Sequence, residues 1–138
     1  MAADATECDW RATDPVTGEF RTRQERTDAL VFIERVELLS QVGTGYAEVS
    51  LAGRVFPMLA LSFSGDNGVV HQFASAERTL LLRGGGSVNG DVAVEVPILE
   101  GSHPFTGDFV STARRARKIV EDFVAGVEPA SLGQWDEL

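Results

Sequence analysis

Few side chains in this 138-residue sequence could act as an acid, a base or a nucleophile: two histidines and one cysteine. Catalysis needs such a group to be held among partners that set its pKa and orientation. His71 alternates with Val69 and Phe73, a pattern typical of a histidine satisfied within a sheet, and His103 precedes a proline in an expected loop. We therefore predict no catalytic residue.

The residue spacing also gives little support to a metal or phosphate site. The two histidines could join Asp108 or Glu100 around a metal ion, but no pair has the i, i+4 helical spacing or the Cys-x-x-Cys spacing of a strong metal motif. The Gly-Gly-Gly-Ser run at 84–87 is not followed by Lys-Ser/Thr or directly by a helix, as a phosphate loop would be. We predict no metal, no cofactor and a mobile loop at 84–87.

Charged side chains gather in two ways. Four of the twelve basic residues lie together at 114–118, between the apolar positions of one helix, so we expect a solvated helix face rather than a nucleic-acid contact. Acidic and amide side chains occur in or beside expected turns and strands, where a rim of carboxylates could meet a basic groove. These candidate partner-binding residues are Asp66, Asn67, Glu77, Asp91, Glu95 and Glu100.

The overall charge indicates a basic partner. With 21 acidic and 12 basic residues, the net charge is −9, which repels nucleic acid and anionic lipid and attracts cationic surfaces. The longest nearly apolar stretch, 55–63, is too short to cross a bilayer, and the first residues lack the regions of a signal peptide. Cys8 is the only cysteine, so no internal disulfide is expected. We predict a soluble, cytoplasmic protein that binds neither membrane nor nucleic acid directly.

The length and an apolar content of 43% predict one domain over 1–138. Residues 1–22 show no sustained period, so we expect an extended arm with at most one short strand, and Cys8 within it. The segment Thr22–Glu25 has the form of a capping box, and apolar residues then recur at three-residue steps. This pattern predicts a first helix over about 24–40.

The middle of the chain predicts a sheet of about five strands. Residues 47–51 alternate between apolar and polar, as in a strand with one wet face, and 56–63 are almost continuously apolar, as in a central strand. A turn-rich segment then leads into 69–73, which predicts an antiparallel hairpin. The remaining strands are expected at 79–83 and 92–96.

The last third predicts a second helix that begins near Asp108. Its apolar stripe, spaced by four and three residues, should pack on the sheet; it comprises Phe109, Ala113, Ala116, Val120 and Phe123. Gly126 and Pro129 should end the helix, after which Leu132 and Trp135 can fold the tail back onto the domain. The predicted fold class is α+β, an antiparallel sheet of about five strands flanked by an N-terminal and a C-terminal helix.

Residues 113–138 resemble the end of bacterial immunity proteins that neutralise deaminase toxins of interbacterial competition systems. The shared features are an Ala-rich amphipathic helix ending in Phe-x-x-Gly, a proline a few residues later, and a terminal Trp followed by an acidic residue. Upstream the resemblance is weaker, but the expected elements, including the glycine-rich segment 83–90, follow in the same order as in these proteins. The whole resemblance spans about residues 27–138.

This resemblance implies an inhibitor, not an enzyme, that binds a cognate toxin and blocks its active site or substrate groove. The resemblance implies that the partner is a basic, nucleic-acid-directed toxin domain, and it favours a deaminase. Such an enzyme flips a base into a pocket beside a basic channel, where an acidic protein could compete with substrate.

Two other functions remain open at this point. One is a small-ligand-binding protein or enzyme that uses a cavity between the second helix and the sheet, with His71 at its mouth. The other is an assembly domain in which residues 92–98 form an exposed edge strand that pairs with a second copy.

Overall fold

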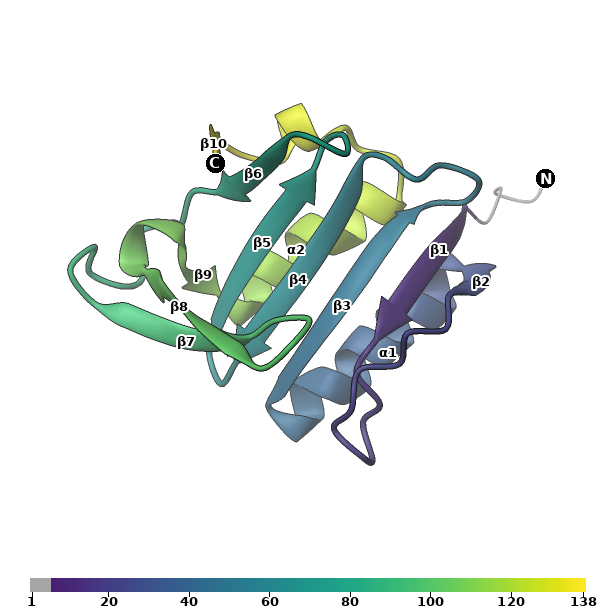
Figure 1. Ribbon diagram of the computed structural model, residues 1–138, viewed down its shortest axis with the longest axis horizontal. Coiled ribbons are helices and arrows are strands. Elements are labelled where there is room, and N and C mark those ends of the chain that lie inside the picture. Colours follow the sequence, from purple (N-terminus) through teal and green to yellow (C-terminus); the bar gives the residue numbers. More distant parts are fainter. Residues whose placement is uncertain (1–5) are drawn as a thin grey trace.

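The computed structural model describes residues 6–138. One large antiparallel sheet has both helices on one face and a two-stranded hairpin across the other (Figure 1). The strands are β1 (Glu7–Ala12), β2 (Glu25–Asp28), β3 (Thr44–Leu51), β4 (Met58–Ser64), β5 (Asn67–Phe73), β6 (Thr79–Leu82), β7 (Ala93–Pro97), β8 (Ser102–Thr106), β9 (Ser111–Thr112) and β10 (Trp135–Glu137). The helices are α1 (Ala29–Val42) and α2 (Ala113–Val124), with 3-10 turns at Gly107–Phe109 and Pro129–Ser131.

The main sheet has the order β10-β6-β5-β4-β3-β1-β2, and β9 pairs with β5. The predicted α+β class with an antiparallel sheet is confirmed, but this sheet has eight strands rather than about five. The β4–β5 hairpin is present, and β4 lies between β3 and β5 as the predicted central strand.

Alternation along the strands separates two layers of side chains. Val49, Leu61 and Val70 face the helices and belong to the main core. The opposite face of the sheet, called here the outer face, carries a smaller core in which Val69 packs with Val96 of β7. The sheet is therefore covered on both faces near its centre.

Residues 7–12 of the predicted N-terminal arm form the one short strand that the prediction allowed, but this strand, β1, is incorporated into the sheet, between β2 and β3. Cys8 and Trp10 are buried in the main core. The Trp10 ring lies 5.7 Å from that of Phe32, and its Nε1 donates to Thr27 Oγ1 at 2.8 Å. Residues 1–5 of the predicted arm lie outside the described part of the chain.

The charged residues of β1 explain why the sequence pattern did not predict a strand inside the sheet here. Asp9 is buried and pairs with Arg26 at 2.7 Å, while Arg11 pairs with Glu48 at 2.7 Å. Charged residues at alternate positions normally indicate a wet strand face or a loop. Here they are matched by charges on β2 and β3, far along the sequence.

The first helix also begins later than predicted. Residues 25–28 pair with β1 as β2, and α1 begins at Ala29, after an Asp28 N-cap whose side chain makes no capping hydrogen bond. The predicted capping box at Thr22–Glu25 is therefore wrong, because pairing at the sheet edge outweighs a weak local signal. The predicted three-residue pattern holds only in part: Val36 and Leu39 are buried, but Phe32 is the third buried position, whereas Leu30 is 70% exposed.

Strands β7 and β8 form a separate hairpin rather than completing the main sheet, as was expected of residues 92–96. Figure 1 shows the hairpin crossing in front of β4 and β5, and β7 contacts both strands. Two glycines hold it in place: a Cβ atom on Gly84 would collide with the carbonyl of Val110, and one on Gly107 with the carbonyl of Asn89. The expected loop at 84–87 therefore starts from a tightly packed backbone position. Pairing with β8 also occupies one edge of β7, the proposed self-pairing strand.

We expect Gly107→Ala to destabilise the protein by about 1–3 kcal/mol, as overpacking against backbone does. Gly85→Ala is the control, since its added methyl would meet only the flexible Arg115 side chain at 3.8 Å. Thermal melts of the two variants compare the sites. Equal melting temperatures would show that the hairpin shifts without cost.

Helix α2 starts at Ala113, later than predicted, with Thr112 as its N-cap; the Thr112 hydroxyl accepts a hydrogen bond from the Arg115 backbone N–H at 3.1 Å. Its predicted stripe faces the main core, except that Phe109 lies in the preceding 3-10 turn and packs against the smaller core. The tail folds back as expected, and β10 pairs with β6. Neither helix of the described chain is long and apolar enough to cross a membrane.

Candidate binding surface and cavities

The structure separates the six predicted binding residues into three places. The first is the hairpin β7–β8 with its flanks, which carries Asp91, Glu95 and Glu100. Asp66 and Asn67 lie at the β4–β5 turn, and Glu77 lies at the β5–β6 turn, beyond the opposite end of β5. All five carboxylates are exposed. Half of the predicted set thus shares one projecting element, and the rest does not.

The hairpin carboxylates have no basic partner among residues 6–138, whereas most basic side chains are paired with other acidic groups. On α2, for example, Arg117 pairs with Glu37 and Glu121, and Lys118 pairs with Asp122. The charges of most basic side chains are thus compensated by neighbouring carboxylates. The hairpin keeps uncompensated negative charge, which can act at a distance on a cationic surface.

A cavity of about 490 Å³ lies between the outer face of the sheet and the hairpin, and is called here the outer cavity. The sheet contributes Tyr46, Glu48, His71 and Phe73 to its walls, and the hairpin contributes Leu99 and Phe105. In the register of the sheet, Glu48 of β3 and His71 of β5 stand on either side of Ala60 of β4.

Glu48 gives this cavity a buried polar wall. Its Oε1 accepts a hydrogen bond from Arg11 Nη2, and its Oε2 accepts one from the Tyr46 hydroxyl, both at 2.7 Å. Burial and the neighbouring Glu48 carboxylate raise the pKa of Tyr46 well above its usual range, so the phenol stays protonated. Both carboxylate oxygens are therefore engaged.

The sequence does not indicate these buried polar residues, because the alternation of residues 47–51 predicts a wet strand face for Glu48 and Ser50. They are in fact 5% and 7% exposed. The strand alternation was correct, but β1 and the hairpin cover this region, and both are remote in sequence. An acidic residue flanked by a tyrosine two positions away was the only local signal.

His71 faces the outer cavity as a neutral ring. Burial, with a smaller contribution from His103, lowers the pKa of His71 to about 4. Its ring lies 5.3 Å from that of Phe105 and 6.2 Å from that of Phe73. No hydrogen bond to the ring is formed by residues 6–138. The predicted cavity beside His71 was misplaced, because α2 covers the other face of the sheet.

We expect the stability of the protein to fall as the pH is lowered from about 6.5 to about 4. In this range the unfolded chain protonates His71 and the folded protein does not, so the unfolded state binds more protons and the free energy of unfolding decreases. The pKa shift corresponds to at most about 3 kcal/mol. Denaturant titrations across the range should show a smaller loss for His71→Gln. Parallel curves for the two proteins would exclude His71 as the cause.

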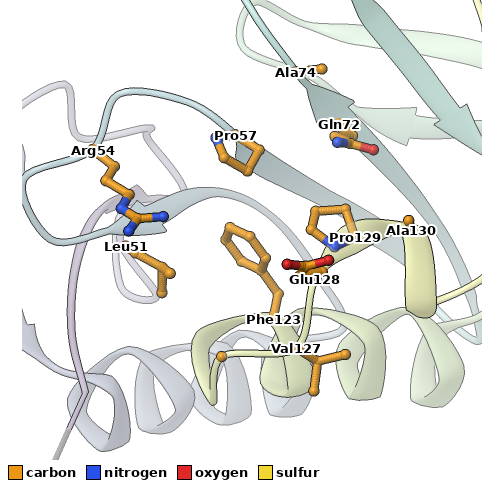
Figure 2. Close-up of a pocket in the computed structure, with 11 residues that line it drawn as sticks. Leu51, Arg54, Pro57, Gln72, Ala74, Phe123, Val127, Glu128, Pro129 and Ala130 are labelled. Carbon is orange, nitrogen blue, oxygen red and sulfur yellow. The ribbon is translucent and has the colours of Figure 1, made fainter.

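A second cavity, of about 580 Å³, lies where the β3–β4 connection meets the segment after α2 (Figure 2). Figure 2 shows the Phe123 ring projecting from α2 into this space, with Arg54 on one side and Glu128 on the other. The two charged residues are exposed and belong to connecting segments. This cavity therefore has a core residue within it but no buried charged group on its walls.

The residues that carry the C-terminal resemblance have structural roles here. Phe123 is buried, and Gly126 has a φ of 107°, which favours glycine. Pro129 begins a 3-10 turn, and its carbonyl accepts a hydrogen bond from Trp135 Nε1 at 2.8 Å. Together they turn the chain after α2 and bring β10 to the sheet edge.

The remaining reactive groups are not assembled into a site. Within residues 6–138 there is no cluster of three or more side chains suited to hold a metal ion. Cys8 is buried in β1 rather than in a flexible arm; burial and nearby carboxylates raise the pKa of its thiol to about 11. The thiol is therefore protonated at neutral pH and is a poor nucleophile.

Comparison with known proteins gives no family. The sequence matches no protein-family model, and no curated protein matches it at a significant level.

Proposed function

We propose that this protein is an immunity protein that binds a bacterial toxin domain and blocks the toxin's active site or substrate groove. The toxin is a basic, nucleic-acid-directed enzyme, and the resemblance of residues 113–138 favours a deaminase. In this proposal the protein acts in the cytoplasm and needs neither a cofactor nor a catalytic residue.

The main support for this proposal comes from the hairpin β7–β8. It projects from the sheet face that the helices leave free, and its carboxylates lack basic partners in the described chain. Val92 and Leu99, at 48% and 50% exposure, place apolar surface beside those charges. Apolar contacts within a charged rim are a common composition for a protein interface.

The net charge of −9 fits the same partner. An enzyme that acts on nucleic acid needs a cationic channel for the phosphate backbone. An acidic hairpin can occupy such a channel by the same attraction that draws in the substrate, and it steers the encounter. A nucleic acid itself would be repelled.

Coexpression with the toxin domain encoded by the neighbouring gene tests the proposal. We expect survival of cells that make both proteins, and a one-to-one complex in size-exclusion chromatography with light scattering. Cell death despite folded inhibitor, together with the absence of a complex, would reject it.

The outer cavity favours a second candidate function, a small-ligand-binding protein or enzyme that uses His71. Its volume is within the range of small-molecule sites, and its walls are mainly apolar with a few polar groups. A folded protein that gave no protection against the toxin but bound a small molecule beside His71 would support this candidate.

Replacing both histidines, His71→Gln and His103→Gln, separates the two functions. An inhibitor that works by occupying a groove transfers no proton, so we expect the folded double variant to retain protection, with at most a small loss of toxin affinity because His71 lines the outer cavity. Glutamine keeps hydrogen-bonding capacity and should preserve the fold. Circular dichroism provides the folding control. Loss of protection by a folded double variant would favour the ligand or enzyme function.

A further inference from the structure

We propose that the outer cavity receives an uncharged aromatic side chain of the toxin, which inserts between the sheet and the hairpin β7–β8. This inference rests on the proposed function and adds the chemistry of the central contact. The occupant is tyrosine or tryptophan, with its ring among apolar walls and its polar edge toward His71 and Tyr46.

The walls favour a ring. Phe105 already receives His71 and His103 edge-on, at ring distances of 5.3 and 4.9 Å. Met58, Phe73 and Leu99 also line the cavity. Aromatic rings gain from such offset and edge-to-face neighbours, and they contribute much of the affinity at protein interfaces.

The polar atoms favour an uncharged occupant. A lysine or arginine would need an unpaired carboxylate to compensate its charge, but the charge of Glu48 is already compensated by its salt bridge to Arg11. An aspartate or glutamate would meet neutral His71 and the buried Glu48 charge. A phenol O–H or an indole N–H instead finds hydrogen-bonding capacity on the His71 ring or the Tyr46 oxygen.

The position of the cavity favours the toxin as the source of the ring. Leu99 forms part of its wall, and the next residue is the exposed Glu100 at the tip of the hairpin. The acidic surface that would draw in a basic toxin is therefore continuous with the cavity. A buried aromatic anchor surrounded by a charged rim is the usual arrangement of a tight interface.

Leu99→Trp tests the inference by filling the cavity mouth from within the chain. Leu38→Trp is the matched control, because Leu38 is 48% exposed, against 50% for Leu99, and lies on α1, on the helix side of the sheet. We expect toxin affinity to fall at least tenfold for Leu99→Trp and to change less than threefold for Leu38→Trp. Equal affinities of the two folded variants would overturn the inference while leaving the toxin complex intact.

A second measurement uses p-cresol and 3-methylindole, the side-chain analogues of tyrosine and tryptophan, in NMR titrations of the toxin-free protein. Amide shifts at His71, Leu99 and Phe105 in the wild type and in Leu38→Trp, but not in Leu99→Trp, are the expected result. If neither analogue shifts these amides, the cavity does not accept a ring. If both bind but the wild type forms no toxin complex, the proposed function fails and the cavity belongs to a free small molecule.

Discussion

Replacing Phe123 by alanine is expected to lower the free energy of unfolding by about 3–5 kcal/mol. The side chain is 2% exposed and joins α2 to the sheet within the main core. It also borders the second cavity, so truncation would enlarge an existing space rather than allow the walls to close. Denaturant unfolding, monitored by circular dichroism, measures the change.

Phe56→Ala is the control for that prediction, since Phe56 is 39% exposed and lies in the β3–β4 connection. Removing the same atoms from a partly exposed position should lower the free energy of unfolding much less. A melting temperature lowered by less than about 3 °C in Phe123→Ala would mean that the core repacks around the missing ring.

Under the proposed function, reversal of the three hairpin charges, Asp91→Lys, Glu95→Lys and Glu100→Lys, is expected to slow association with the toxin by about tenfold or more at low salt. The reason is electrostatic: an attractive surface becomes a repulsive one before the proteins touch. Stopped-flow measurements over a range of salt concentrations should show that the difference shrinks as salt rises.

A second triple variant separates local charge from net charge. Glu19, Glu25 and Glu34 are exposed and form no salt bridge with residues 6–138, and their reversal to lysine changes the net charge by the same amount. None of them lies on the hairpin. For this second triple variant we expect only a modest reduction in the rate of association with the toxin. Equal reductions in the two triple variants would place the interface elsewhere on the protein.

Local patterns predicted the elements whose signals lie within a short stretch of sequence. The β4–β5 hairpin and the stripe of α2 follow from turn residues and from apolar spacing, and both were found. The place of β1 inside the sheet was not predicted, because Asp9 and Arg11 resemble solvated residues until Arg26 and Glu48 are placed beside them. The same cause displaced the start of α1.

The candidate surface was predictable in its chemistry but not in its layout. Turn-associated carboxylates were identified correctly as exposed groups, yet nothing local indicates that residues 93–106 leave the main sheet and cross its outer face. That crossing buries Glu48 under remote segments and creates the cavity beside His71. Long-range coverage of this kind has no signature in a short window of sequence.

The main core draws on both ends of the described chain, from Cys8 and Trp10 to Leu132. The chain must therefore leave the ribosome as far as Leu132 before that core can close. At roughly 5–20 residues per second, synthesis of this chain takes on the order of 10 s. A sheet that combines distant pairings, such as β1–β3 and β6–β10, with hairpins of consecutive strands folds within roughly milliseconds to seconds. If the protein acts as the proposed immunity protein, the delay before a newly made molecule can bind its toxin is thus set mainly by translation rather than by folding.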